Sequence, residues 1–179
     1  MQTALDTVSN WCSQAGLTVS VTKTYVMLVG RTHPPCTLNI NGTILPETQE
    51  IKDLGVTYTN ELSFDPHIEE VCKSASNVSS YIFRAFRSRN PALLGRLFVA
   101  YARPILEYAC QVWTPQQQQT INKIEDVQRR FTLLAFLRKS LPIVSYEDRL
   151  SHLNLPTLQD RRAMADLQLT YKLLYGYTD

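Results

Sequence analysis

Acidic residues are absent from the middle of this chain, because none occurs between Glu70 and Glu107. The same segment holds six basic side chains, which are Lys73, Arg84, Arg87, Arg89, Arg96 and Arg103. A basic surface without carboxylates attracts anions, and one that is also aromatic suits a phosphate backbone. The alternative is a solvated basic helix face with no ligand, and the charges alone do not decide between the two.

Several patterns that mark other classes of site are also missing. The four cysteines lie far apart, with no Cys-x-x-Cys and no histidine at ligand spacing, so neither zinc nor a disulfide framework is expected. No apolar run reaches the roughly 18 residues of a membrane span, and no signal peptide is visible. The sequence has no phosphate loop, dinucleotide fingerprint or nucleophile motif. We therefore expect an intracellular, reducing location in cytoplasm and nucleus, and no membrane association.

Composition allows one domain or two small lobes, since 44% of the 179 residues are hydrophobic. The net charge of +2 hides an uneven distribution. Residues 61–140 carry eleven basic and seven acidic groups, whereas the segments before and after are each slightly acidic. The centre is therefore the candidate anion-binding surface.

The first third of the sequence predicts one helix followed by strands. A helical apolar pattern ends at Gly16, as at a C′ glycine. Residues 19–21 and 25–29 are strand-like, and 38–45 form a hairpin pattern around Asn41-Gly42. Residues 51–58 indicate another strand, in which Gly55 marks a bulge or a close backbone approach.

From Asp65 onward the pattern becomes helical. Asp65-Pro66 and Asn90-Pro91 are typical helix starts, Pro104 should interrupt a helix, and Ser145 and Thr157 are typical N-caps. A further helix is expected at about 120–139, after a glutamine linker at 116–119. The fold class is therefore α+β, with a small antiparallel sheet region followed by a helical bundle.

Five phrases together resemble one family in order and spacing. They are Trp11 with 16–24, then 51–68, 103–115 (RPILEYACQVWTP), 124–131 (IEDVQRRF) and 153–176. They are similar to reverse transcriptases of non-LTR (LINE-type) retrotransposons, and most similar to jockey-like elements. Ala15 and Ser20 stand where the family usually has asparagine, which weakens a polar role at both positions.

The resemblance implies three parts, which are the C-terminal part of a polymerase palm (1–60), a helical thumb (61–140) and a C-terminal helical connector (141–179). Family members use two metal ions held by paired aspartates, and those aspartates would lie before residue 1. The adjacent carboxylates in this chain diverge around their helices and do not replace them. We expect a fragment of an RNA-directed DNA polymerase that is inactive alone and holds no cofactor. The parent enzyme would use Mg²⁺.

The resemblance also implies roles for particular residues. Lys23 matches a lysine that can donate a proton to pyrophosphate, although a lysine at a strand end is more often solvated. Lys52 and Gly55 match a primer-grip hairpin. The expected partner is an RNA/DNA primer–template duplex, together with the missing N-terminal palm and fingers. The candidate nucleic-acid-binding residues are Lys52, Gly55, Arg84, Arg87, Arg89, Arg96, Arg129 and Arg130.

Less specific interpretations remain for the aromatic residues and for the whole chain. Trp113 and Tyr108 are in a helical setting that favours core packing over base stacking, and Tyr81 lies near an apolar stripe. His67 is most simply a capping-region residue, and His33 and His152 have no partner visible in the sequence. The alternative function is a helical protein-interaction module retained from a decayed retroelement.

Overall fold

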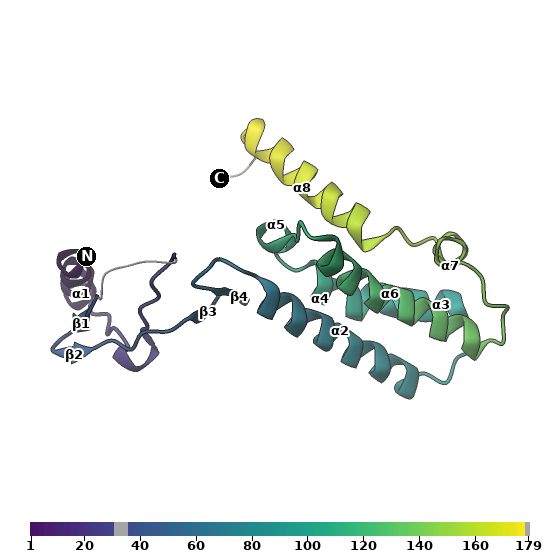
Figure 1. Ribbon diagram of the computed structural model, residues 1–179, viewed down its shortest axis with the longest axis horizontal. Helices are drawn as coiled ribbons and strands as arrows, with labels where there is room; N and C mark the ends of the chain where they lie inside the picture. The colour runs from purple at the N-terminus through teal and green to yellow at the C-terminus, as the bar shows by residue number, and fades with distance from the viewer. Residues whose placement is uncertain (31–35, 178–179) are drawn as a thin grey trace. The chain divides into compact units, whose positions relative to one another are not determined.

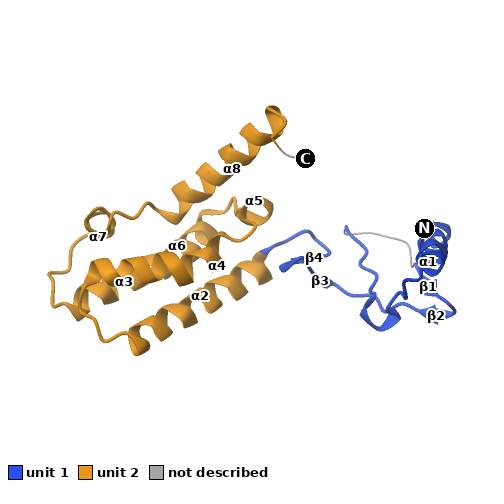
Figure 2. Cartoon of the chain, turned by 180° about the vertical axis from the view of Figure 1, so that it is seen from behind, with its two compact units in different colours: residues 1–64 blue, residues 65–179 orange. Residues whose placement is uncertain are grey.

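The computed structural model describes residues 1–30 and 36–177, so His33 lies outside the described residues. The chain divides into two compact units, residues 1–64 and 65–179 (Figure 2). In its described residues the first unit contains one α-helix and two short antiparallel hairpins, and the second is helical (Figure 1). The predicted α+β class is confirmed.

The first unit begins with α1 (Gln2–Gln14), and Gly16 follows with φ 71°, as expected for a C′ glycine. Strands β1 (Asn39–Ile40) and β2 (Thr43–Ile44) form the first hairpin. Asn41 and Gly42 both have positive φ, so this predicted turn is confirmed. A small apolar core consists of Val26, Leu38, Ile40 and Leu45.

Three details of the first unit differ from the sequence prediction. Residues 19–21 and 25–29 do not form strands. Val21–Lys23 is a 3₁₀ turn, and within 25–29 the β-type pairing is a single bridge from Val26 to Glu47. Residues 51–58 form a hairpin of β3 (Glu50–Asp53) and β4 (Val56–Thr59) where one strand was expected. Gly55 lies in its turn with φ 86° rather than at a bulge, because Leu54 also has positive φ and the chain reverses there.

The second unit is built on two long helices, α2 (Asp65–Ala85) and α6 (Gln118–Arg138). Between them lie α3 (Pro91–Leu97), a π-helical turn over Phe98–Ala102, α4 (Arg103–Glu107) and α5 (Cys110–Trp113). The chain ends with α7 (Tyr146–Leu153) and α8 (Leu158–Leu174). Gln118 and Gln119 belong to α6, so the predicted glutamine linker is shorter than expected, because glutamine is also a good helix former.

An aromatic cluster holds the long helices together. The Phe131 ring of α6 lies 4.8 Å from the Phe83 ring and 4.7 Å from the Phe98 ring, measured between centroids. The Arg138 guanidinium closes the far end of α2 by donating from Nη1 to the Phe83 carbonyl oxygen at 2.8 Å. A cation at a helix C-terminus is favourable because it meets carbonyls that have no partner within the helix.

The predicted helix boundaries depend on capping and on proline. The Asn90 Oδ1 accepts from the Ala92 N–H, the Ser145 Oγ from the Asp148 N–H, and the Thr157 Oγ1 from the Asp160 N–H. Pro104 lacks an N–H for the carbonyl one turn earlier, and the helix widens into the π-helical turn just before it. Within the described ranges, no helix is both long and apolar enough to cross a membrane.

Candidate nucleic-acid interface

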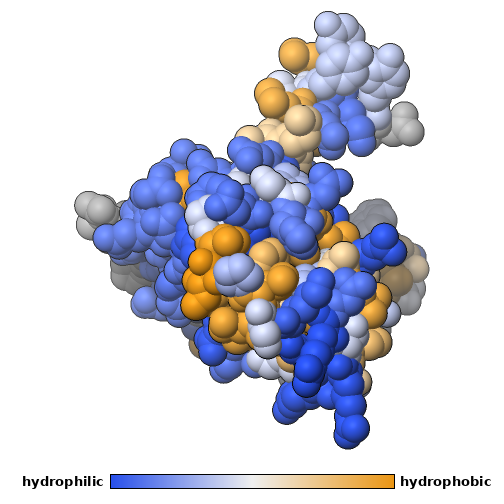
Figure 3. All heavy atoms as spheres, turned by 90° about the vertical axis from the view of Figure 1, so that its right-hand side faces the viewer, coloured by the Kyte–Doolittle hydropathy of each residue, from blue (hydrophilic) through white to orange (hydrophobic). Residues whose placement is uncertain are grey.

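Four of the predicted arginines lie around the connection between α2 and α3. Arg84 is in the last turn of α2, Arg87 and Arg89 are in the connection, and Arg96 is in α3. All four are exposed, and within residues 1–30 and 36–177 none pairs with a carboxylate. Figure 3 looks onto the end of the unit that includes this connection, and strongly hydrophilic side chains project from its lower part. These charges are therefore available to an anion.

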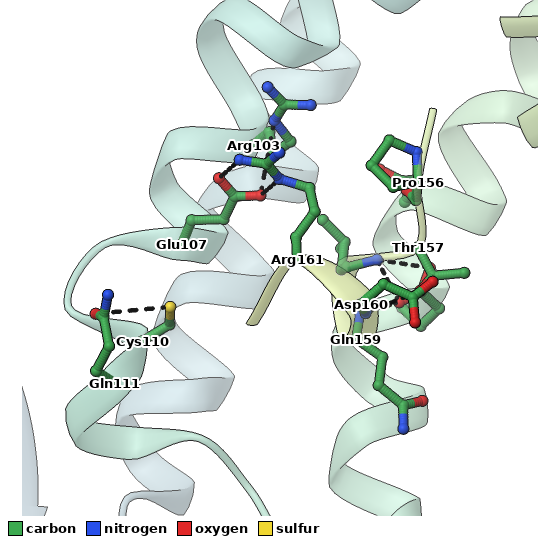
Figure 4. A network of polar contacts seen from close by, with 12 residues as sticks. Arg103, Glu107, Cys110, Gln111, Pro156, Thr157, Gln159, Asp160 and Arg161 are labelled. Atoms are coloured by element: carbon green, nitrogen blue, oxygen red, sulfur yellow. Dashed lines mark hydrogen bonds and ion pairs between the residues drawn. The ribbon is translucent and has the colours of Figure 1, made fainter. Parts of the chain in front are cut away.

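Arg103 shares this acid-free segment but is used inside the protein. Its Nε lies 3.7 Å from Oε1 of Glu107. The Glu107 carboxylate also accepts two hydrogen bonds from Arg161, from Nε to Oε1 and from Nη2 to Oε2, the latter at 2.8 Å (Figure 4). Burial lowers the pKa of Arg103, and the nearby Arg161 charge lowers it further, whereas the bond to Glu107 raises the pKa of Arg161. The three side chains join α4 to α8, beside a hollow of about 490 Å³ that Cys110 also lines.

Arg129 and Arg130 are neighbours on α6 with different surroundings. Arg129 forms an ion pair with Asp126, and its guanidinium carbon lies 4.9 Å from the centre of the Tyr146 ring. Arg130 is exposed and lines a hollow of about 230 Å³ together with residues of α2. Arg130 is therefore the freer of the two for contact with an external anion.

The hollow beside Arg130 contains polar residues that the sequence interpretation missed. Ser76, Asn77 and Ser80 of α2 line it, with Phe83 and Phe131 as apolar neighbours. The Ser80 hydroxyl donates to the Ser76 carbonyl oxygen at 3.0 Å. Hydroxyl and amide groups next to a guanidinium suit phosphate oxygens. The number of serines along α2 could have indicated this polar surface from the sequence.

The candidate site residues of the first unit lie on two different elements, the 3₁₀ turn and the β3–β4 hairpin. Lys23 ends the 3₁₀ turn and is exposed. Lys52 lies on β3, and Gly55 follows in the turn of the same hairpin. The structure therefore places Lys52 and Gly55 on one hairpin and shows no reacting partner for Lys23 within the described chain.

Carboxylates from the adjacent acidic pairs form contacts within the protein. Glu69 pairs with Lys123 at 2.9 Å, which joins α2 to α6. The Asp148 carboxylate accepts from the capping Ser145 hydroxyl at 2.7 Å. In the described residues, no group of three or more histidine, cysteine, aspartate or glutamate side chains is placed to hold a metal ion.

Glu125 is a buried carboxylate whose role the sequence interpretation did not identify. It accepts from the Tyr146 hydroxyl and from the backbone N–H groups of Leu158 at 3.0 Å and Gln159 at 3.3 Å. These N–H groups begin α8, so the carboxylate sits at the positive end of that helix. Burial and the hydrogen bond to Glu125 raise the pKa of Tyr146. The sequence does carry an indication of this buried position, because Glu125 lies one turn after Ile121 on the apolar face of α6.

Two further buried polar residues surround Glu125. The Gln128 Nε2 donates to the Tyr146 hydroxyl at 3.1 Å and to the Pro156 carbonyl oxygen at 3.0 Å. Arg162 is buried on α8, and burial lowers its pKa while the charge of Glu125 opposes that change. We call Glu125, Gln128, Tyr146 and Arg162 the α6–α8 hub. Glu125 and Gln128 of the 124–131 phrase thus have a structural role in this hub.

The aromatic predictions divide between core and surface. Trp113 is buried, as expected, and its Nε1 donates to the Tyr108 carbonyl oxygen at 2.9 Å. The expectation of core packing was wrong for Tyr108, which is exposed because the chain turns through a left-handed Ala109 just after it. Tyr81 is also exposed. His67 is buried edge-on against the Trp113 ring at 5.3 Å and is thus more than a capping-region residue.

Comparison with known proteins gives two relatives. An uncharacterised protein of Caenorhabditis elegans is 29% identical over 127 residues, which cover 71% of this chain and 64% of that protein. A probable RNA-directed DNA polymerase from transposon BS of Drosophila melanogaster is 26% identical over 137 residues, which cover 73% of this chain and 15% of the polymerase. The chain thus spans less than two thirds of either relative. No family model and no solved structure matches it.

Proposed function

We propose that this chain is a nucleic-acid-binding part of an RNA-directed DNA polymerase from a non-LTR, jockey-like retrotransposon. Residues 1–60 would be the end of the palm, 61–140 the thumb and 141–179 a connector. The similarity to the fly transposon polymerase supports the link to reverse transcription. The order of the five sequence phrases supports the retrotransposon type and the position within the polymerase.

The observation that carries the proposal is the group of four exposed arginines without carboxylate partners, Arg84, Arg87, Arg89 and Arg96. Each can neutralise one phosphate and release a counterion, which is a sequence-independent source of affinity. Arg130 with Ser76 and Asn77 offers a further phosphate contact on the α2–α6 face of the same unit. We infer that the ligand is the sugar–phosphate backbone of a primer–template duplex.

The palm residues have narrower proposed roles. Gly55 would let the β3–β4 turn approach the primer backbone closely, because it has positive φ and no Cβ. Lys52 would contribute a charge to the same contact, and Lys23 would approach the triphosphate. The aspartates that hold Mg²⁺ in the parent enzyme would belong to the N-terminal part of the palm, outside residues 1–179. We therefore propose that this chain alone has no polymerase activity. We also propose that it is located in the cytoplasm and nucleus.

Fluorescence anisotropy with a labelled RNA–DNA duplex tests the proposal. Four to five phosphate contacts predict a fall in affinity of roughly 150- to 500-fold between 50 and 200 mM salt, with little dependence on duplex sequence. The variant Lys172→Ala is the matched control, because it removes an exposed charge from α8, away from the α2–α3 connection. Affinity that does not change with salt would contradict the proposal.

The second candidate is a helical protein-interaction module, and the exposed apolar side chains of α8 favour it. It predicts that Arg84, Arg87 and Arg96 can be changed to alanine without loss of function, whereas apolar surface residues cannot. Duplex binding and partner binding by the same set of variants separate the two functions.

A further inference from the structure

The hollow beside Arg130, which we call the Arg130 hollow, has two polar walls of different chemistry. Helices α2 and α6 lie side by side at this point (Figure 1). Helix α2 contributes Ser76, Asn77, Ser79 and Ser80, and α6 contributes the Arg130 guanidinium. Among the described residues that line the hollow, none carries a carboxylate. One wall is therefore neutral and rich in oxygen, and the other carries a positive charge.

Two of the serines on the α2 wall are set as hydrogen-bond acceptors. The Ser79 hydroxyl donates to the Ala75 carbonyl oxygen at 2.7 Å. The Ser80 hydroxyl donates to the Ser76 carbonyl oxygen at 3.0 Å. A serine hydroxyl has one hydrogen and two lone pairs, so these two oxygens are left with lone pairs alone for a ligand. Since a phosphate oxygen also only accepts, this wall calls for a ligand group that brings its own hydrogen.

The ribose 2′-hydroxyl is the backbone group of a nucleic acid that meets this requirement. Phosphate, ester and sugar-ring oxygens only accept, whereas the 2′-hydroxyl both donates and accepts. It is present in RNA and absent from DNA, and in an A-form helix it is displayed in the wide, shallow minor groove. The acceptor wall thus matches the RNA strand of a hybrid and not the DNA strand.

The charges around the Arg130 hollow suit the same strand. Asn77, Ser80 and Arg84 are separated by three and four residues, so they share one face of α2. Arg84 lies about 6 Å further along the helix axis than Ser80. It is exposed, and in the described chain it forms no ion pair with a carboxylate. A strand with its ribose at Ser80 therefore meets Arg84 along α2 and Arg130 on the opposite wall, and both guanidinium groups can donate to its phosphates.

We propose that the Arg130 hollow recognises a ribose 2′-hydroxyl and so holds the RNA strand of the hybrid against α2 and α6. The 2′-hydroxyl donates to the oxygen of Ser80, the more exposed of the two acceptors, or to that of Ser79. Arg130 donates to the phosphate beside that ribose. This inference rests on the proposed function and adds to it the strand and the chemical group that are recognised.

Fluorescence anisotropy of the full chain with two RNA–DNA hybrids of one sequence tests the inference. In the second hybrid every ribose of the RNA strand carries fluorine in place of the 2′-hydroxyl. Fluorine keeps the sugar pucker of RNA, and so the A-form shape, but has no hydrogen to donate. The parent chain should bind the hydroxyl hybrid about three- to tenfold more tightly than the fluoro hybrid, as expected for the loss of one or two hydrogen bonds.

Serine variants locate the preference. The double variant Ser79→Ala/Ser80→Ala should bind both hybrids equally and keep the parent's salt dependence, because it removes both acceptors and no charge. Ser80→Ala alone, at an exposed position, repeats the test without altering the buried Ser79 and should reduce the preference. The matched control is Ser74→Ala, the same change on α2 outside the residues that line the hollow, which should keep the parent's preference. Circular dichroism of each variant shows whether the helices are retained.

The outcomes separate this inference from the proposed function. Salt-dependent binding with equal affinity for the two hybrids overturns the inference and leaves the proposed function standing. A preference that survives in the double variant also overturns it, because the 2′-hydroxyl is then recognised elsewhere. Failure of the parent to bind either hybrid refutes the proposed function, and the inference with it.

Discussion

Replacing Glu125 should destabilise the helical unit far more than replacing its neighbour Asp126. Glu125→Ala removes a buried carboxylate and leaves the Tyr146 hydroxyl and the first N–H groups of α8 without their acceptor. It also removes the charge that opposes the desolvation of buried Arg162. Breaking one side of such a buried set costs about 3–5 kcal/mol. Glu125→Gln keeps one acceptor oxygen, so its cost should be smaller, about 1–2 kcal/mol.

Urea unfolding measures these differences as changes in the free energy of unfolding. A Trp11→Phe background makes Trp113 the sole tryptophan, and that residue is buried within the helical unit. The matched control is Asp126→Asn, which breaks an exposed pair with Arg129 and should cost no more than about 1 kcal/mol. If Glu125→Ala costs no more than Asp126→Asn, the α6–α8 hub is not what joins α8 to the bundle.

Three further outcomes are expected. At pH 8 a thiol reagent should modify Cys12 and Cys36 before Cys72 and Cys110. Burial raises the pKa of Cys72 to about 11 and also raises the pKa of Cys110, so these two thiols form few reactive thiolates at pH 8. Equal rates for all four thiols in the folded protein would contradict this. Trp113→Phe should lower the free energy of unfolding by about 1–3 kcal/mol, measured in urea by circular dichroism, since it loses the bond to the Tyr108 carbonyl and packing volume, whereas Trp11→Phe, at an exposed position, should change it little. Glu107→Gln should cost about 1–2 kcal/mol in the same assay, because it weakens the partly buried link to Arg161, and no change would show that this link is not needed to hold α8.

The helical half was more predictable from sequence than the strand half. Asn90, Ser145 and Thr157 act as caps because capping depends on contacts between residues two or three apart, which a sequence displays directly. The segments at 19–21 and 25–29 have strand-like patterns, but a strand also needs a neighbour to pair with, and the pattern does not contain one. The Leu54-Gly55 turn was missed because leucine rarely adopts positive φ.

The candidate interface was predictable in charge, whereas the contacts between its helices were not. The absence of acidic residues between Glu70 and Glu107 indicated a basic surface, and Arg84, Arg87, Arg89 and Arg96 do lie exposed. Arg103 and Arg129 pair with Glu107 and Asp126 within their own helices, at spacings of four and three residues, whereas the contact of Glu107 with Arg161 joins α4 to α8 and depends on the fold. The Arg130 hollow depends on α2 and α6 lying side by side, which is a tertiary fact.

The salt dependence of duplex binding by an arginine variant tests the central claim most directly. The chain with Arg84, Arg87, Arg89 and Arg96 all changed to alanine should keep its helices, because these side chains are exposed. If they contact phosphates, the slope of log affinity against log salt should become shallower by about 3–4 relative to the parent, and Lys172→Ala should leave it unchanged. A quadruple variant with the parent's slope and affinity would contradict the account, because the phosphates would then be bound elsewhere or not at all.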